Sequence, residues 1–583
     1  TSYEDWRGQR VQVGPDTLRA VLEALGVDPA DPGPPAGERL LPPAVVVREG
    51  KASDLVLPSG ARSVVEHADG SVLPFDPDLP LGVHRLRSTV DGKEHVAPLL
   101  VVPERIDPPA LRDGGRPWGL MSQVYSVRSR ASWGMGDLRD VAELVDWSAR
   151  DLRADFTLVN PMHATEPLPP VEPSPYLPVG RRYVSPLYIR IEDVPEYARL
   201  DPIEREGVQR LARPLRERGR TADLLDRDAV WRAKREALEV LFRVPRAPGR
   251  EAALRGYLER EGQPLVEFAT WCALAEEYGT DFRTWPTGLR DVSAHEVGTE
   301  ALRRWPTVEF HRWVQWILDE QLSKVREVAR DGGMGVGVVH DLALGVQVGG
   351  SDAWMYGDTL LTGLNVGAPP DEFNQRGQDW KQPAWHPRRL AELGYEPFRQ
   401  VLDQALRHAG GVRVDHVMGM FRLWCVPEGA PPDQGTYLGF DHEGMVGTLL
   451  LAARRAGAVV IGEDLGTIEP WAREHLADRG VLGTSVLWFE RDAQGDPLPP
   501  EAWRTDCLAT VATHDLPPVT SYLSAEHVEL RAHMGLLDRP VAEERATTEA
   551  YVERWRAFLV ELGLLDPEVD PLIDPAAVTE AMH

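Results

Sequence analysis

The sequence predicts an α/β fold: a (β/α)8 barrel with helical insertions, preceded by a small N-terminal β-sandwich. The main observation is an apolar run at residues 411–420 that reads as a strand ending in Arg413, Asp415 and His416. A segment of helical period, with apolar residues at Phe398 and Leu402, comes just before it. Strands that deliver polar residues at their carboxyl ends are how a (β/α)8 barrel builds its active site.

The same pattern recurs in three further apolar runs. Residues 335–341 end in His340-Asp341, residues 458–464 end in Glu463-Asp464, and residues 508–515 end in Thr513-His514-Asp515. The intervals between these runs suit one or two βα units, each of which takes about 30 residues or more. Any one of these acids could instead cap a helix or pair with a neighbour. Their recurrence favours a shared rim of carboxylates.

The chain length of 583 residues predicts two or more domains. Residues 1–43 are predicted to contain a helix followed by a proline-rich linker that begins at residue 29. The helix is indicated by an apolar stripe at Leu18, Val21, Leu22 and Leu25. Residues 44–110 read as a β-sandwich accessory domain. Its expected strands are residues 44–48, 54–57, 83–90 and 95–102, with a hairpin turn at Asp91-Gly92. This module is either a ligand-binding platform or a structural support, and the lack of an evident exposed Trp pair favours support.

The catalytic barrel is predicted to span residues 116–583. Its other expected strands are residues 118–124, 156–159 and 483–490. Asp137 is interpreted as a helix N-cap rather than an acid of the rim. Residues 195–330 are predicted to be a helical insertion that walls the cleft, with its aromatic residues in the core. No final apolar strand is recognisable after Asp515, which predicts a shortened C-terminal end.

Composition excludes several classes of protein. The net charge of −27, without a basic block, disfavours binding to nucleic acid or to an anionic membrane. Cys272, Cys425 and Cys507 lack metal-ligand spacing and predict no disulfide framework, so we expect a cytoplasmic protein. The sequence contains no apolar span of membrane length. Nothing in it calls for a metal or an organic cofactor.

Three carboxylates on one rim indicate sugar chemistry. Glycosidic cleavage commonly uses one carboxylic acid to protonate the leaving oxygen and a carboxylate to attack the anomeric carbon or to activate water. For a retaining reaction the two groups lie about 5–5.5 Å apart. Arg413, two residues before Asp415, points to the same side of the strand and would favour the ionised carboxylate.

These motifs resemble a known family. Arg413-Val-Asp415-His416, Gly-Glu463-Asp-Leu-Gly and Thr-His514-Asp515 are similar to motifs of glycoside hydrolases of the α-amylase clan. The segment Gly-Ala-Pro-Pro-Asp-Glu-Phe-Asn-Gln-Arg-Gly-Gln-Asp-Trp at residues 367–380 resembles a hallmark of 4-α-glucanotransferases, the amylomaltases of glycoside hydrolase family 77. Segments 174–176 and 185–188 also resemble the family, and the resemblance runs from about residue 118 to 515.

The resemblance implies roles for individual residues. Asp415 would be the nucleophile, Glu463 the general acid and then base, and Asp515 the stabiliser of the transition state. Arg413, His416 and His514 would support them at the substrate. The remaining implied substrate-binding residues are Tyr176, as a stacking platform, and Asp371, Phe373, Gln378 and Trp380, beside the acceptor sites. Where the family has glycine before Asp341, this chain has His340, which leaves the role of Asp341 open.

The predicted function is transfer of α-1,4-glucan segments between maltooligosaccharides by a retaining double displacement through a glucosyl-enzyme on Asp415. Maltooligosaccharides and α-1,4-glucans would serve as donor and acceptor. One alternative is an α-1,4-glucan hydrolase of the same clan. Another is a non-catalytic glucan-binding protein, which the presence of all three acids disfavours. The oligomeric state is left open by the sequence.

Overall fold

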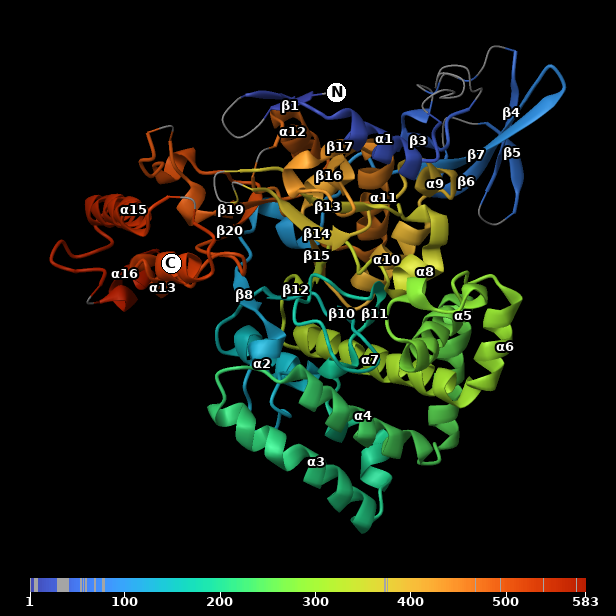
Figure 1. Ribbon diagram of the computed structural model, residues 1–583, viewed down its shortest axis with the longest axis horizontal. Helices are drawn as coiled ribbons and strands as arrows, with labels where there is room; N and C mark the ends of the chain where they lie inside the picture. The colour runs from blue at the N-terminus through green and yellow to red at the C-terminus, as the bar shows by residue number, and fades with distance from the viewer. Residues whose placement is uncertain are drawn as a thin grey trace. The chain divides into compact units, whose positions relative to one another are not determined.

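The computed structural model describes residues 2–4, 9–28, 41–52, 55, 57, 60–67, 70–75, 79–371, 374, 376–466, 468–492, 494–537, 539–572 and 574–582. The chain forms two compact units. The first comprises residues 1–460 and 478–480, and the second comprises residues 461–477 and 481–583. Figure 1 shows the elements of each unit, which are described in turn.

A parallel sheet forms the centre of the first unit. Its strand order is β18-β15-β12-β9-β8. The strands are β8 (Gly119–Ser122), β9 (Phe156–Val159), β12 (Gly337–Leu342), β15 (Gly411–Val414) and β18 (Val459–Gly462), of which Val459 and Val460 belong to this unit. Residues of β9, β12 and β15 are almost all buried, as expected for parallel strands covered on both faces. Each strand lies within a few residues of its predicted position.

Helices cover this sheet. Helix α2 (Leu138–Arg150) contacts β9, and α10 (Glu396–Leu406) contacts β12 and β15. The prediction that Asp137 is an N-cap is confirmed, because its carboxylate accepts from the backbone N–H groups of Arg139 and Asp140. Helix α11 (His442–Ala456) contacts α10 and two strands of the N-terminal sheet, β3 (Val45–Arg48) and β7 (Lys93–Val102).

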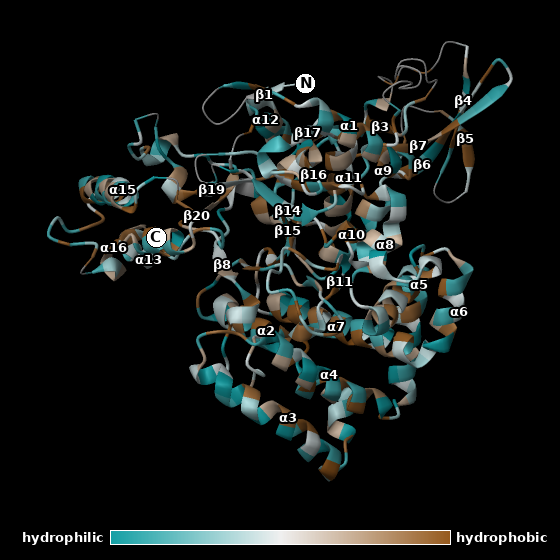
Figure 2. Ribbon diagram, in the orientation of Figure 1, coloured by the Kyte–Doolittle hydropathy of each residue, from teal (hydrophilic) through white to brown (hydrophobic). Residues whose placement is uncertain are grey.

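Residues 195–330 are helical, as the sequence indicates. The helices are α3 (Pro202–Thr221), α4 (Arg227–Arg243), α5 (Pro248–Tyr278), α6 (His295–Arg303) and α7 (Trp305–Asp331). Trp231, Phe310 and Trp313 are buried in one hydrophobic cluster, so these aromatic residues belong to the core. Figure 2 shows hydrophobic and hydrophilic residues mixed along α5 and α7, consistent with helices that bury only part of their surface.

A four-stranded antiparallel sheet in the first unit was not anticipated from the sequence. Its order is β14-β13-β16-β17, and its strands are β13 (Leu364–Ala368), β14 (Gln378–Gln382), β16 (Arg422–Pro427) and β17 (Thr436–Gly439). The segment 367–380, interpreted as a loop, is therefore in part a hairpin between β13 and β14. Helix α1 (Pro15–Ala24) packs against β13 and β16. Other short elements are β10 (His163–Ala164), β11 (Gly180–Val184), α8 (Ser351–Tyr356) and α9 (Pro387–Glu392).

The N-terminal accessory segment contains a five-stranded sheet of order β3-β7-β6-β4-β5. The strands not yet given are β4 (Arg62–Glu66), β5 (Val72–Pro74) and β6 (Gly82–Val90). The predicted hairpin at Asp91-Gly92 is confirmed; both residues have positive φ, 50° and 75°, and Val90 pairs with Lys93. A sandwich needs a second sheet, so the β-sandwich stays a prediction. Most of the proline-rich linker, and residues 54 and 56 of the expected strand 54–57, lie outside the described residues. Strand β1 (Ser2–Glu4) pairs with β2 (Arg10–Gln12).

The second unit contains a two-stranded parallel sheet and a helical cluster. Strand β19 (Gly483–Val486) pairs with β20 (Cys507–Thr510), and Gly462 donates its N–H to the carbonyl of Leu482 at 2.7 Å. The helices are α12 (Pro470–Asp478), α13 (Val519–Leu523), α14 (Glu526–His533), α15 (Val541–Glu561) and α16 (Pro575–Met582). Trp488 and Trp555 anchor its hydrophobic core.

Among the described residues no strand follows β20, so the fold is a mixed α/β fold with a parallel sheet that does not close. In the part of the chain that the structure describes, no helix is long and apolar enough to cross a membrane.

Candidate active site

Three side chains form an ion cluster at the carboxyl ends of β12 and β15. The two strands run parallel with Asp341 opposite Arg413, and the N–H of Asp415 extends the ladder to the carbonyl of Leu342 at 3.0 Å. Arg413 Nη1 lies 2.8 and 2.9 Å from the two oxygens of Asp341 and 3.1 Å from Asp415 Oδ1. One buried guanidinium therefore joins two carboxylates that come from neighbouring strands.

In this cluster the single positive charge of Arg413 faces two carboxylates. Burial by itself lowers the pKa of Arg413, but the carboxylates of Asp341 and Asp415 outweigh that effect and raise its pKa above the ordinary value. The side chains of Arg413 and Asp341 are 6% and 5% exposed, whereas that of Asp415 is 21% exposed. Of the two carboxylates, Asp415 is thus the one with an open face.

Tyr176 belongs to the same cluster. Its hydroxyl donates to Asp341 Oδ2 at 2.6 Å, and its carbonyl accepts from Gln382 Nε2 at 2.9 Å, which ties the loop to β14. Burial, followed by the charge of Asp341, raises the pKa of this phenol, so it stays a hydrogen-bond donor. Asp341 therefore accepts hydrogen bonds from both Arg413 and Tyr176. The sequence left the role of Asp341 open, and these contacts show that it positions both side chains.

His416 follows Asp415 in the left-handed region of backbone space, with φ of 45° and ψ of 60°. This turn sends the chain out of β15 and sets the imidazole edge-on to the ring of Trp380, with centroids 5.4 Å apart. Burial lowers the pKa of His416 to about 4, so the ring is neutral near pH 7. Trp380 in turn donates Nε1–H to Gln378 Oε1 at 3.2 Å.

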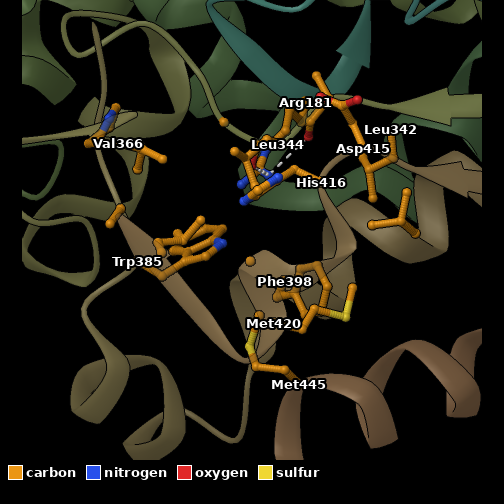
Figure 3. Close-up of a pocket in the computed structure, with 17 residues that line it drawn as sticks. Arg181, Leu342, Leu344, Val366, Trp385, Phe398, Asp415, His416, Met420 and Met445 are labelled. Carbon is orange, nitrogen blue, oxygen red and sulfur yellow. Dashed lines mark hydrogen bonds between the residues drawn. The ribbon is translucent and has the colours of Figure 1, made fainter. Parts of the chain in front are cut away.

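Asp415 and His416 border a pocket (Figure 3). The other lining residues that the figure labels are Arg181, Leu342, Leu344, Val366, Trp385, Phe398, Met420 and Met445. Arg181 and Trp385 were not found from the sequence. The Arg181 guanidinium donates to the carbonyls of Ala343 and Leu344 at 3.3 and 2.5 Å and lies 5.2 Å from the Trp385 ring centre. No sequence signal marked Arg181, because its partners are backbone carbonyls distant in the chain.

The hairpin between β13 and β14 carries Gln378 and Trp380 and, at its turn, Asp371. Asp371 Oδ1 accepts from the N–H of Asn374 at 2.5 Å, and the N–H of Asp371 donates to the carbonyl of Asn374 at 3.1 Å. These bonds give the turn a defined shape. Phe373, which was expected beside the acceptor sites, lies outside the described residues.

Glu463 and Asp515 belong to the second unit, whereas Asp415 belongs to the first. Glu463 follows the end of β18, and its Oε1 accepts from the N–H of Leu465 at 2.7 Å. Asp515 follows β20 by five residues, and its side chain is 68% exposed. His514 Nε2 lies 3.1 Å from Asp515 Oδ1.

Comparison with known proteins identifies the class to which this fold belongs. A protein-family profile described as 4-alpha-glucanotransferase matches residues 122–561. The 4-alpha-glucanotransferase of Mycobacterium tuberculosis is 46% identical, over 98% of this chain and 85% of its own length. That of Haemophilus influenzae is 30% identical, over 88% of this chain and 75% of its own length.

Solved structures agree with the sequence comparisons. The crystal structure of amylomaltase from Corynebacterium glutamicum is 39% identical, with a TM-score of 0.87, over 100% of this chain and 88% of that one. The amylomaltase from Streptococcus agalactiae in complex with acarbose shares the fold, with a TM-score of 0.60 at 17% identity. The mixed α/β fold is thus that of an amylomaltase-like carbohydrate enzyme. The chain belongs to the 4-alpha-glucanotransferase family, glycoside hydrolase family 77, whose members transfer segments of α-1,4-glucan.

Proposed function

We propose that the chain transfers glucan segments by a retaining double displacement with Asp415 as nucleophile. The observation that carries this proposal is the Arg413 contact at 3.1 Å, which favours the anionic carboxylate, together with the 21% exposure of Asp415 at the pocket. The carboxylate attacks the anomeric carbon of the donor, and the glycosidic oxygen leaves with a proton. A glucosyl-enzyme ester on Asp415 results.

Glu463 supplies that proton and then, as a carboxylate, removes one from the acceptor hydroxyl that attacks the glucosyl-enzyme. The same group serves as acid and base because the second step is the chemical reverse of the first. Asp515, with His514 beside it, holds sugar hydroxyls and stabilises the positive charge that develops on the ring. Carboxylates that follow the ends of parallel strands are typical of a (β/α)8 barrel, which we include in the proposal.

The substrates are maltooligosaccharides and longer α-1,4-glucans, used as donor and as acceptor. The acarbose complex of the Streptococcus agalactiae relative supports a pocket for this class of sugar. The hairpin that carries Asp371, Gln378 and Trp380 forms the acceptor side. An acceptor sugar held there excludes water, which favours transfer over hydrolysis. A cytoplasmic location and a supporting role for the N-terminal sheet complete the proposal.

Incubation with maltotriose alone tests this function. Glucose together with a ladder of chains longer than maltotriose is the expected product pattern in time-resolved chromatography. Maltose and glucose alone would mean the hydrolase alternative. Binding of maltotriose by calorimetry without any product, from a folded sample, would mean the glucan-binding alternative.

The Asp415→Asn variant tests the nucleophile. Loss of the carboxylate is expected to lower the transfer rate by at least about 10³-fold, since the covalent step has no substitute. Near-normal turnover by a variant that unfolds at the wild-type temperature would refute the role of Asp415. Asp403→Asn, an acid on helix α10, is the matched control.

A further inference from the structure

Gln382, the last residue of strand β14, binds the loop that carries Tyr176. Its side chain is 6% exposed, and its Nε2 donates to the backbone carbonyl of Tyr176 at 2.9 Å. A carbonyl oxygen can only accept, so the amide of Gln382 turns its nitrogen toward Tyr176. This hydrogen bond joins the hairpin of β13 and β14 to a loop that lies 206 residues earlier in the chain.

A bulge in β14 comes just before Gln382. Consecutive residues of β13 pair with Gln382 and with Asp379, so Trp380 and Lys381 bulge out of the ladder. Lys381 lies in the left-handed region, with φ of 57°. Asp379 fixes this shape, because its Oδ1 accepts from the N–H of Lys381 at 2.9 Å and its Oδ2 accepts from Asn365 Nδ2 at 3.1 Å. Bulges re-aim the side chains of edge strands, and β14 is an edge strand of its sheet.

Gly345 leaves room for the side chain of Gln382. A Cβ atom at position 345 would lie 2.6 Å from Gln382 Oε1 and 3.1 Å from Gln382 Cβ. The backbone of Gly345 lies outside the left-handed region, so its lack of a side chain serves this close approach. One end of the amide thus lies against the backbone of Gly345, and the other end binds Tyr176.

Direct contacts lead from Gln382 to Asp415. Gln382 binds the backbone of Tyr176, and the hydroxyl of Tyr176 donates to Asp341 at 2.6 Å. Arg413 in turn donates to both Asp341 and Asp415. We propose that Gln382 is a positioning residue for the ion cluster beside the proposed nucleophile, acting through the hydroxyl of Tyr176. The hairpin on the proposed acceptor side is in this way joined to the group that attacks the donor.

The inference rests on the proposed role of Asp415 and deepens it. Without the amide of Gln382 the carbonyl of Tyr176 loses its donor, the loop shifts, and the hydroxyl no longer meets Asp341 squarely. A glutamine with a purely structural role would lower stability, but its effect on the rate would not depend on that hydroxyl. A double-mutant cycle separates the two cases, since residues that act through one contact give effects that do not add.

Two substitutions of Gln382 probe the contact. Gln382→Met removes the hydrogen bond and keeps the length of the side chain, whereas Gln382→Glu keeps the shape and replaces the donor by an acceptor. Each is made in the wild type and in Tyr176→Phe, and kcat and KM are measured for the release of glucose from maltotriose. Thermal unfolding of every variant is followed by circular dichroism.

Gln315→Met is the matched control. Gln315, on helix α7, is 5% exposed, and its Nε2 donates to the carbonyl of Val184 at 2.8 Å. Its Oε1 also accepts from the N–H of Val184 at 3.1 Å. Gln315→Met should therefore lower Tm at least as much as Gln382→Met does, and leave kcat within about twofold of the wild-type value.

We expect Gln382→Met and Gln382→Glu to lower kcat by about three- to tenfold, with a smaller change in KM, because the donor that places Tyr176 is lost. In Tyr176→Phe the same substitutions should change kcat by less than about twofold. Losses that multiply in the double variants would overturn the path through the hydroxyl. An unchanged kcat in the single variants, or a larger effect on KM than on kcat, would overturn the positioning role.

Asp415→Asn separates failure of this inference from failure of the proposed function. If Asp415→Asn keeps near-normal turnover, the proposed nucleophile is wrong and the inference about Gln382 falls with it. If Asp415→Asn is inactive but the losses of the Gln382 and Tyr176 variants multiply, only the inference is wrong.

Discussion

The hydroxyl of Tyr176 donates to the buried carboxylate of Asp341, with 2.6 Å between the two oxygens. The same carboxylate receives Arg413, and Arg413 contacts Asp415. This contact gives Tyr176 a role in the ion cluster, separate from the predicted one of a stacking surface for a sugar ring. It satisfies one lone pair of Asp341 and so supports the cation beside the proposed nucleophile.

Tyr176→Phe keeps the ring and removes only this hydrogen bond. Asp341 then has one buried oxygen with fewer donors, which costs about 1–3 kcal/mol locally and loosens Arg413. We expect kcat for maltotriose disproportionation to fall about tenfold with KM nearly unchanged, because the stacking face remains. A larger effect on KM than on kcat would show that Tyr176 acts through sugar binding instead. Tyr437→Phe, on strand β17, is the control.

Much of the parallel sheet could be predicted from the sequence. Strands buried on both faces read as continuous apolar runs, and β9, β12 and β15 are of this kind. Their polar terminal residues stand out against that background, which is why Asp415 and Arg413 could be placed together. The capping box of α2 and the turn at Asp91-Gly92 were equally local, since each depends on a few consecutive residues.

The antiparallel sheet was missed because its pairing is not local. Strand β13 pairs with β16, some sixty residues later, and neither shows a clean alternation of polar and apolar residues. The partners of Asp341 were hidden for the same reason, since Tyr176 lies in a loop far from it in sequence. Arg181 donates to backbone carbonyls, which every residue carries, so the residue types in the sequence do not reveal these contacts.

A second buried ion cluster joins Arg190 to two carboxylates at the start of helix α2. Arg190 Nε lies 2.6 Å from Asp137, and its Nη2 lies 2.8 Å from Asp140; all three side chains are at most 6% exposed. Arg190→Ala leaves two buried carboxylates unpaired, so we expect a loss of about 3–5 kcal/mol in the free energy of unfolding. Urea unfolding followed by tryptophan fluorescence measures it.

The exposed pair Arg150–Asp146 on helix α2 gives the comparison for that experiment. Arg150→Ala should lower the free energy of unfolding far less than Arg190→Ala does, as is usual for a solvated pair. If the two variants lost similar free energy of unfolding, the buried cluster would contribute no more to stability than an exposed ion pair.

Partly buried histidines predict a loss of stability in acid. Burial, and then the charge of His408, lowers the pKa of His340 to about 4, whereas an unfolded histidine titrates near 6.5. As the pH falls from about 6.5 to 4, the unfolded state binds a proton that the folded state does not. Stability is therefore full above about pH 6.5 and declines below it, by about 1.4 kcal/mol per pH unit for this group.

His340→Gln should accordingly flatten the pH dependence of the free energy of unfolding between pH 6 and 4.5. His163 and His416, with pKa values lowered to about 3 and about 4, add slopes of the same sign and remain in the variant. The exposed His295 provides the control, His295→Gln. An unchanged slope in His340→Gln would mean that His340 takes up its proton without unfolding.

Trp380 tests the acceptor side of the proposed reaction. Its ring meets His416 at 5.4 Å, directly after the proposed nucleophile, and its place on β14 is fixed by the hairpin that carries Gln378. Trp380→Ala removes an aromatic face worth about 1 kcal/mol to a stacked ring, so the acceptor sugar competes less well with water. We expect the ratio of transfer to hydrolysis with maltotriose to fall about fivefold, measured as longer chains formed per glucosidic bond lost. The ratio for Trp380→Phe should lie between those of the wild type and of Trp380→Ala. Trp147 is an exposed tryptophan on α2, and Trp147→Ala should leave the ratio unchanged. If Trp380→Ala lowers the total rate but leaves the ratio as it is, the hairpin does not form the acceptor site, and water must be excluded by another wall of the pocket.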